Sequence, residues 1–436
     1  MKTLYETITA EAKNLAPEAV RIRRDLHAHP EEGWMEYYAS ALVASHLEAL
    51  GLEVLVGDAV TASPRMGLPT AARLDAAYDR ALKAGADARW LRAMKGGKTG
   101  VVGILRGGEG PVVALRFDLD ALPLAESDAD DHVPVREGFA STWQGTMHAC
   151  GHDGHTAIGL GVAKLLATHR TQLRGTVKFL FQPAEEGVRG ADAMIRKGHL
   201  DDVDVLLGAH IQSNATFNGK LIPSASGALA TTKLDVHLHG RASHAGSAPE
   251  EGHNVMRGVA AIIQGLYGIP RHSAGASRVN VGTVHAGSGR NVVADDAMME
   301  MEVRGATTAI NAYMEDYARR IVEGACLMHD LHYEIDVRGT AASLESSPTL
   351  VQKIREVVQA TMPPDTLSDT AEQVLVDSED ISLMMARVQA HGGQAAFMRL
   401  LTDLKDVPHA HCFDFNEAVI ETGITVFSLV TVALLQ

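Results

Sequence analysis

The sequence is poor in cysteine and aromatic residues and contains no long apolar run. Its three cysteines are too few and too far apart for a disulfide framework, so we expect a reducing, cytoplasmic environment. No stretch of about 18 consecutive apolar residues occurs that could span a bilayer. The first residues (MKTLYETITAEAKNLAPEAVRIRRDLH) are charged and amphipathic and have no apolar signal core. These absences argue against a disulfide-stabilised secreted protein and against a membrane protein.

Basic residues are outnumbered, with 39 lysines and arginines against 54 aspartates and glutamates and a net charge of −15. A field of this sign repels nucleic acid and anionic membrane surfaces, so neither is an expected partner. Hydrophobic residues make up 46% of the chain, enough for a full core, and a length of 436 residues suggests two or three domains. The composition therefore predicts a globular protein of more than one domain.

Apolar periodicity predicts an α/β fold. Continuous apolar runs typical of buried strands occur at 101–105, 112–117, 176–181 and 203–210. Helical patterns lie before, between and after these runs, at 4–50, 154–168, 188–197, 348–361, 379–390 and 416–434. Strands that alternate with helices favour a mostly parallel sheet flanked by helices.

Two segments depart from this pattern. Residues 58–98 contain a Pro-rich turn (SPRMGLP), a polar helical run and a Gly-Gly pair, which predict a helical insert on the surface. Residues 224–335 show the order β-α-β-β-α-β of a ferredoxin-like α+β domain. We therefore expect one domain formed by 1–223 and 336–436, with 224–335 inserted as a second domain.

The segment MHACGHDGH at 147–155 gathers groups that bind transition metals. His148, Cys150, His152, Asp153 and His155 lie together between a loop and the start of a predicted helix. Imidazole and thiolate are metal ligands, and the end of a loop can direct several side chains at one point. A polar loop with hydrogen-bonded histidines is the alternative, but three histidines beside a cysteine favour a metal site.

Three further segments place polar side chains at the ends of apolar strands or before a helix. In FLFQPAEEG, Glu185 and Glu186 follow a hydrophobic strand, where one carboxylate can bind metal while the other moves protons. Two glutamates that start a solvated helix are the alternative. His210 ends the strand in GAHI, and His409 and His411 precede a helix in VPHAHCFDFNE. Open α/β sheets bind ligands beyond the carboxyl ends of their strands, so together these side chains suffice for two metal ions.

These motifs make the chain similar to a known family. It resembles the aminoacylase/carboxypeptidase family of metallohydrolases, in the branch of hippurate hydrolases and auxin-amide hydrolases. The motifs span nearly the whole chain: RRDLHAHPEEGWMEY (23–37), RFDLDALPL (116–124), MHACGHDGH, QPAEEG, GRASHAGSAPEEGHN (240–254) and HCFDFNE. The resemblance implies a metal-dependent amidohydrolase with a metal-binding catalytic domain and an inserted lid and dimerisation domain.

A second set of motifs resembles one subgroup of that branch, whose members cleave aroyl-glutamates. These motifs are SPRMGLP, GFAS (138–141), GASRVNVG (275–282), GSGRNVV (287–293) and SEDISLMMARVQ (378–389). The implied substrate is an N-acyl amino acid with a free α-carboxylate, specifically an N-aroyl glutamate such as p-aminobenzoyl-glutamate. Residues 397–408 (FMRLLTDLKDVP), just before His409, depart from the subgroup's smaller, Gly-containing segment.

The resemblance implies metal ligands at Cys150, His152, Glu186, His210 and His409, which would hold two divalent ions. Cys150 would take the place of a bridging aspartate in more distant relatives. His411 is the alternative to His409, although spacing to the FDF run favours His409. The thiolate favours zinc on softness, whereas the family leaves manganese equally open.

The resemblance also implies roles outside the ligand set. Glu185 would be the general base, and Asp118 would orient a metal ligand. His244 would stabilise the oxyanion, often in the partner subunit's site, and Arg290 and Asn291 would bind the substrate carboxylate.

Several functions share these features. A broad aminoacylase or dipeptidase has the same catalytic residues and differs in pocket shape. Two alternatives come from other classes. A metal-storing or metal-sensing module would not need an inserted closing domain. A non-catalytic partner subunit would not need Glu185. The sequence is compatible with both a homodimer and a heterodimer formed with a homologous subunit.

Overall fold

The chain forms two compact units in a computed structural model that describes residues 2–375 and 377–436. The first unit consists of Met1–Ser226, Glu345–Val374 and Asp380–Gln436, and the second of Gly227–Leu344 and Leu375–Glu379. The second unit therefore interrupts the first in sequence. Its end at Leu344 differs from the expected boundary after residue 335, which falls inside a strand of the second unit, His332–Ala341.

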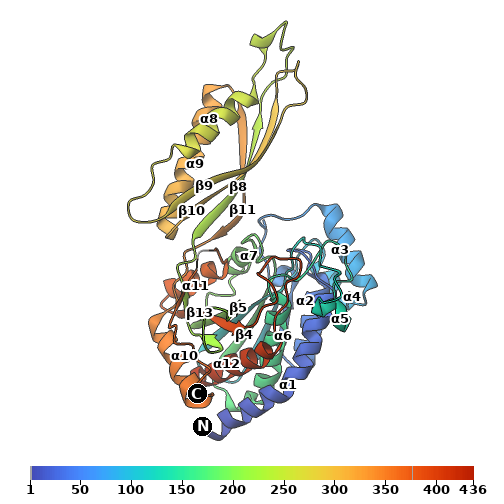
Figure 1. The fold of residues 1–436 in the computed structure, drawn as a ribbon, viewed down its shortest axis with the longest axis vertical. Coiled ribbons are helices and arrows are strands. Elements are labelled where there is room, and N and C mark those ends of the chain that lie inside the picture. The colour runs from blue at the N-terminus through green and yellow to red at the C-terminus, as the bar shows by residue number, and fades with distance from the viewer. Residues whose placement is uncertain (1, 376) are drawn as a thin grey trace. The chain divides into compact units, whose positions relative to one another are not determined.

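A seven-stranded sheet with the order β1-β2-β4-β3-β5-β13-β6 forms the centre of the first unit (Figure 1). Its strands are β1 Glu53–Val56, β2 Val101–Arg106, β3 Val112–Asp118, β4 Thr176–Gln182, β5 Val205–Ser213, β6 Leu221–Ile222 and β13 Gln394–Thr402. β4, β3, β5 and β13 run parallel, whereas β1, β2 and β6 pair antiparallel at the two sides. The predicted mixed α/β fold with a largely parallel sheet is confirmed, and the carboxyl ends of the four parallel strands lie at one edge.

Helices cover both faces of this sheet (Figure 1). The helices of the first unit are α1 Lys2–Ala28, α2 Tyr37–Ala49, α3 Ala71–Lys83, α4 Ala88–Met94, α5 Val133–Glu137, α6 His152–Thr168, α7 Gly190–Arg196, α10 Pro348–Thr361, α11 Ile381–Ala390 and α12 Ala418–Leu434. Phe117 of β3 packs against Phe427 of α12, with ring centroids 5.1 Å apart. Successive strand residues face opposite sides, so its neighbour Arg116 reaches Asp380, just before α11, across 3.1 Å.

Two predicted elements differ from the structure. The helical pattern over 4–50 is divided into α1 and α2, because Pro30 disfavours helical geometry at the residue before it. The sequence pattern predicts no strand between 390 and 416, yet β13 lies inside the sheet between β5 and β6. Its sequence, QAAFMRLLT, is an apolar run that Arg399 interrupts, and eight of its nine residues are buried.

The insert lies at the surface, and one face of each of its helices packs against the first unit's core. Thr70 caps α3 and Asp87 caps α4, each by accepting a hydrogen bond from a main-chain N–H of the first turn. Apolar side chains of both helices join the large hydrophobic core: Leu74, Ala77, Ala81, Leu91 and Met94. The prediction of helices was right, and the prediction of a surface location was incomplete.

A four-stranded antiparallel sheet with the order β11-β8-β10-β9 forms the second unit. Its elements follow in the sequence as β8 Ala230–His239, α8 Val255–Tyr267, β9 Ser277–Ala286, β10 Asp296–Gly305, α9 Thr308–Met328 and β11 His332–Ala341. This succession and strand order are those of a ferredoxin-like unit. A short parallel pair, β7 Ala225–Ser226 and β12 Gln373–Val374, lies outside both main sheets.

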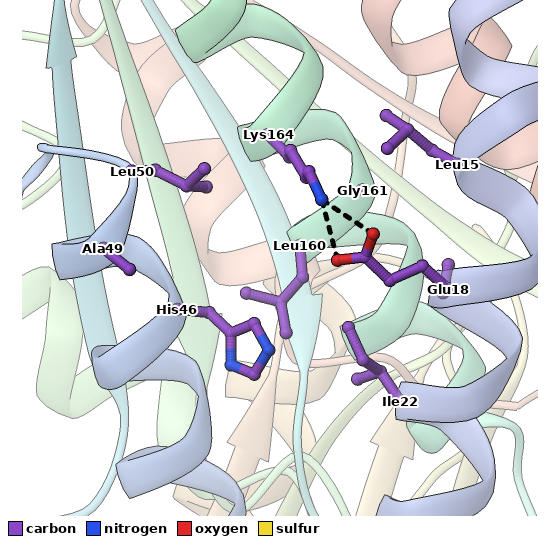
Figure 2. Close-up of a pocket in the computed structure, with 10 residues that line it drawn as sticks. Leu15, Glu18, Ile22, His46, Ala49, Leu50, Leu160, Gly161 and Lys164 are labelled. Carbon is purple, nitrogen blue, oxygen red and sulfur yellow. Dashed lines mark hydrogen bonds and ion pairs between the residues drawn. The ribbon is translucent and has the colours of Figure 1, made fainter.

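A largely apolar cavity that opens to solvent lies between α1, α2 and α6 (Figure 2). Leu15, Ile22 and Leu160 form part of its wall, and an ion pair of 2.7 Å joins Lys164 to Glu18 beside it. None of the residues that the motifs single out lines this cavity. Within residues 2–375 and 377–436, no helix has the length and apolar character that crossing a membrane requires.

Two helical glycines, one in α6 and one in α9, differ in the space around them. A Cβ at Gly159 of α6 would lie 2.6 Å from the Phe117 ring, whereas one at Gly324 of α9 would meet no atom within 4 Å. We expect Gly159→Ala to destabilise the protein by about 1–3 kcal/mol through overpacking. Gly324→Ala should stabilise its helix by roughly 0.5–1 kcal/mol, because alanine lowers the entropic cost of helix formation. Urea denaturation of both variants measures the difference, and equal effects would contradict the described packing.

Candidate metal centre

Side chains that can bind metal converge beyond the carboxyl ends of β3, β4 and β5. Among the described residues four groups contain predicted ligands, and within each group the ligand atoms lie within 4.8 Å of one another. The groups are Cys150 with His152 and His210, Cys150 with Glu186 and His409, His152 with Glu185 and Glu186, and His152 with Asp118 and His155. All five predicted ligands are therefore brought together, and two of the groups share Cys150.

His152, the first residue of α6, presents one ring nitrogen to this centre. Its Nδ1–H donates to the main-chain carbonyl of Asp120 across 2.8 Å, which leaves the lone pair on Nε2. Nε2 is buried and has no hydrogen-bond partner among the described residues. Burial disfavours the charged ring, but Asp118, Asp120 and Cys150 together outweigh burial and raise the pKa of His152. The surroundings thus favour positive charge at Nε2, which a bound metal ion would supply in place of a proton.

His210 and Cys150 have matching chemistry. The His210 Nδ1–H donates to the carbonyl of Ile211 across 2.6 Å, and Nε2 lies 3.4 Å from the Cys150 sulfur. Burial lowers the pKa of His210, so the ring is neutral, which is the form that binds metal. Burial also raises the pKa of the Cys150 thiol. A divalent ion would supply the positive charge that ionises this thiol, so the donor set fits a metal.

Asp120 organises the carboxylate side of the centre, and the sequence analysis did not single it out. Its carboxylate accepts main-chain hydrogen bonds from Glu185 (3.0 Å) and Glu186 (2.9 Å). Through its carbonyl the same residue also orients His152. The signal in the sequence was RFDLDALPL, in which Asp118 and Asp120 both follow a buried strand, and only Asp118 was considered.

Asp118 binds His155, which is not one of the proposed metal ligands. His155 donates from Nδ1 to Asp118 across 2.6 Å and accepts at Nε2 from the Ile211 N–H across 2.9 Å, so both ring nitrogens are engaged. Burial opposes ionisation of Asp118, but the charges of His152 and Arg116 hold its pKa well below the usual range. The other Asp118 oxygen lies 3.9 Å from His152 Nε2, which supports an orienting role.

Asp153 of the same motif faces away from the centre. Its Oδ2 accepts from Arg23 Nε and His27 Nδ1, both across 2.8 Å. All three side chains are fully buried, so this network fixes the start of α6 against α1. A buried charge of this kind is retained because it is paired, and Asp153 is therefore structural.

In the segment VPHAHCFDFNE, the structure distinguishes His409 from His411 as candidate ligands. Nε2 of His409 lies 3.4 Å from the Glu186 carboxylate. His411 donates from Nδ1 to the Ala125 carbonyl across 2.6 Å and belongs to none of the candidate groups within the described part of the chain. The main chain of His409 has a φ of 68° and its N–H bonds to the carbonyl of Ala149, which joins this segment to the MHACGHDGH loop. The geometry favours His409 over His411.

The remaining site candidates lie together in the second unit. His244 accepts at Nδ1 from the N–H groups of Gly246 and Ser247, both across 3.1 Å, so its Nε2 carries the proton and is a donor. A β-bridge joins His244 to Val292, and the Asn291 carbonyl accepts from the neighbouring Ala245. The Arg290 and Asn291 side chains are exposed and bond to no residue in the described ranges.

A parallel-centred sheet with a cysteine, histidine and glutamate cluster beyond its strand ends is the arrangement of a metallohydrolase. The profile of peptidase family M20/M25/M40 matches residues 114–432, and the chain belongs to this family. It is a hydrolase that acts on amide bonds.

Several relatives match along nearly the whole chain. Identity is 43% to one of the subunits of p-aminobenzoyl-glutamate hydrolase from Escherichia coli and 44% to indole-3-acetyl-aspartic acid hydrolase of Enterobacter agglomerans, each over 96% of both chains. The crystal structure of the aminobenzoyl-glutamate utilization protein from Klebsiella pneumoniae is similar with a TM-score of 0.82, 38% identity and 97% coverage of both chains. The Bacillus subtilis YxeP protein, a dinuclear metal-binding peptidase of family M20, matches with a TM-score of 0.65, 25% identity and coverage of 97% and 99%.

Substitutions in the centre should separate metal binding from proton transfer. Cys150→Ala and Glu186→Gln should lose metal and amide hydrolysis together, because each removes a ligand. Glu185→Gln should keep the metal and lower the rate by about 10²–10⁴-fold, because it removes only the proton acceptor. Elemental analysis of the purified variants, combined with rates of hydrolysis, makes the distinction.

His411→Ala serves as the control for His409→Ala. The first should keep both metal and activity, and the second should lose both. If Glu185→Gln lost the metal while Glu186→Gln retained it, the assignment of the two carboxylates would be reversed.

Proposed function

We propose that the chain is a two-metal amidohydrolase that cleaves N-acyl amino acids whose acyl group is aromatic, such as p-aminobenzoyl-glutamate. The observation that carries the proposal is the sharing of Cys150 by two ligand groups, one with His152 and His210 and the other with Glu186 and His409. Each group would hold one divalent ion, zinc or manganese. The similarity to a dinuclear metal-binding peptidase supports the number of ions.

Glu185 is the proposed general base. It is buried and lies in the same group as Glu186 and His152, so it can reach a water molecule at the centre. Divalent ions bound there would polarise the amide carbonyl and increase the acidity of water. Glu185 would accept the proton of the attacking water and deliver it to the leaving nitrogen.

The second unit would supply groups that bind the substrate. The Nε2–H of His244 is a suitable donor for the developing oxyanion, a contribution that is typically worth roughly 3–4 kcal/mol of barrier. Arg290 can bind a carboxylate with two parallel hydrogen bonds, and Asn291 can add an amide donor. The net charge of −15 disfavours long-range attraction of an anion, so capture depends on such local donors.

The names of two relatives support the substrate class. Both p-aminobenzoyl-glutamate and indole-3-acetyl-aspartate join an aromatic acyl group to an acidic amino acid, and the chain is 43% and 44% identical to their hydrolases. The two relatives therefore share the chemistry of the substrate while they differ in its acyl group and amino acid. A general aminoacylase, which would ignore the aromatic group, is the outcome to exclude by experiment.

We also propose that the second unit mediates dimerisation. β9 pairs with β10 on one side and forms an edge of the sheet as far as the structure describes the chain. Val284 of β9 and the nearby Val292 are exposed apolar residues. Edge strands of this kind pair readily with another chain, either a second copy or a homologous subunit.

Substrate recognition is tested with three compounds: p-aminobenzoyl-glutamate, its amide-capped form and acetyl-glutamate. Capping the α-carboxylate should lower kcat/KM about 10- to 100-fold, because a charge-assisted hydrogen bond contributes roughly 1.5–3 kcal/mol. Arg290→Ala should reduce kcat/KM for the free acid by the same factor and leave the capped substrate unaffected.

Arg271→Ala, which removes another exposed arginine of the second unit, is the matched control and should retain wild-type rates. A capped substrate that is cleaved as well as the free acid would contradict carboxylate recognition. Equal rates with acetyl and aroyl groups would leave a general aminoacylase.

Complementation tests whether His244 acts in the partner's site. Inactive His244→Ala and Glu185→Gln chains are mixed after subunit exchange. Random exchange makes half of the dimers mixed, each with one intact site, so about a quarter of wild-type activity should return. Mixed dimers without activity would show that each site is built within one chain.

A further inference from the structure

The loop that carries Glu185 and Glu186 has an unfavourable main-chain conformation. Ala184 and Val188, on either side of the two glutamates, have φ angles of 52° and 59°. This left-handed region is costly for a residue with a side chain and especially for a β-branched one such as Val188. The loop therefore needs external contacts to hold its shape.

Buried carboxylates provide part of these contacts. Glu36 accepts from the N–H of Ala184 across 2.7 Å, before the two glutamates. Asp380 accepts from the N–H groups of Gly190 and Ala191 across 3.1 and 3.0 Å, after them. Both ends of the loop are thereby fixed to the protein interior.

Glu186 is held on both sides of its own main chain. Its N–H donates to Asp120, and its carbonyl accepts from Nε–H of Arg189 across 2.9 Å. The Glu186 Oε1 atom is buried and has no hydrogen-bond partner among the described residues. The main chain is thus fixed from two directions while the carboxylate points toward Cys150 and His409.

The Nη1 nitrogen of the Arg189 guanidinium reaches the insert. Its Nη1–H donates to the carbonyl of Gly67, in the SPRMGLP turn, across 3.1 Å. The same turn is fixed by Trp34, whose Nε1–H donates to the Met66 carbonyl across 2.8 Å. Gly33 leaves room for the guanidinium, because a Cβ there would lie 2.3 Å from Arg189 Nη2. The planar guanidinium of Arg189 therefore connects Gly67 of the insert to the main chain of Glu186.

We propose that Arg189 is a positioning residue that sets Glu186 for metal binding by tying its carbonyl to Gly67 of the insert. This inference rests on the proposed role of Glu186 as a metal ligand. It gives the 58–98 segment a role at the metal centre through main-chain geometry. Arginine suits the position, since a planar guanidinium can serve two carbonyls at once and a lysine ammonium lacks this fixed fork.

Arg196 provides a matched control. It is the last residue of α7, the helix that begins directly after Arg189, and it donates to the Ser63 carbonyl of the same turn across 3.2 Å and also to the Pro64 carbonyl. Within the described residues its hydrogen bonds and its ion pair go to Asp192, Ser63 and Pro64 and not to Glu186. Loss of Arg196 therefore removes an anchor of the turn without releasing the Glu186 carbonyl.

The test is calorimetric titration of the metal-free full chain with Mn²⁺ alone. Arg189→Ala should weaken binding about 10- to 100-fold, as is usual when a group that orients a ligand is lost. Arg196→Ala should bind like wild type. Added guanidinium ion should partly restore the affinity of Arg189→Ala and leave Arg196→Ala unchanged, which a general loss of structure would not explain.

Arg189→Lys gives a second route if Arg189→Ala fails to fold, because the ammonium group keeps the charge but lacks the planar geometry that serves two carbonyls at once. It should weaken Mn²⁺ binding in the same way. Wild-type affinity in Arg189→Ala, or equal losses in Arg189→Ala and Arg196→Ala, would overturn the proposal. A wild type that binds Mn²⁺ but cleaves no N-acyl amino acid would overturn the proposed function and leave this inference standing.

Discussion

The metal centre depends on the way one buried aspartate holds two segments of chain. Asp120 accepts the main-chain N–H groups of Glu185 and Glu186 through its carboxylate and the ring N–H of His152 through its carbonyl. The loop after β4 and the first turn of α6 are therefore positioned by the same residue. Without Asp120, the proposed base Glu185 and the proposed ligands Glu186 and His152 would lose the contacts that position them relative to one another.

The fold places this aspartate where such contacts are possible. Parallel strands end at one edge of the sheet, so the segments after β3, β4 and β5 meet there even though they are far apart in sequence. Buried ion pairs fix the elements that surround the centre. Arg23 and Asp153 fix α6 against α1, and Arg116 and Asp380 fix the opposite face of the sheet. Removing one partner of such a buried pair typically costs about 3–5 kcal/mol, which makes the surroundings of the centre rigid.

Much of this arrangement could be predicted from the sequence because it follows from local patterns. Continuous apolar runs identified β2 to β5, and the clustered histidines, the Glu-Glu pair and His210 marked the centre. The resemblance to a metallohydrolase family supplied the roles, and the profile match confirmed the family. The chemistry was accessible because the ligands are concentrated in short motifs.

Other features could not be predicted because they depend on tertiary contacts. β13 was missed since Arg399 breaks its apolar run, and it pairs with β5, which lies far away in sequence. The burial of the insert depends on partners such as Tyr37, whose ring packs 5.6 Å from that of Tyr78. The motif RFDLDALPL marks Asp120 as a candidate, but its partners are main-chain N–H groups, which have no signature in residue type. Those contacts become visible only when the fold is known.

Anomalous X-ray diffraction from crystals soaked with Mn²⁺ tests most directly whether Cys150 is shared by two metal ions. Two peaks are expected about 3.5–4 Å apart, the separation usual for two-metal hydrolytic sites, with the Cys150 sulfur between them. His152 and His210 should lie beside one peak, and Glu186 and His409 beside the other. A single peak, or peaks away from these side chains, would contradict the sharing of Cys150.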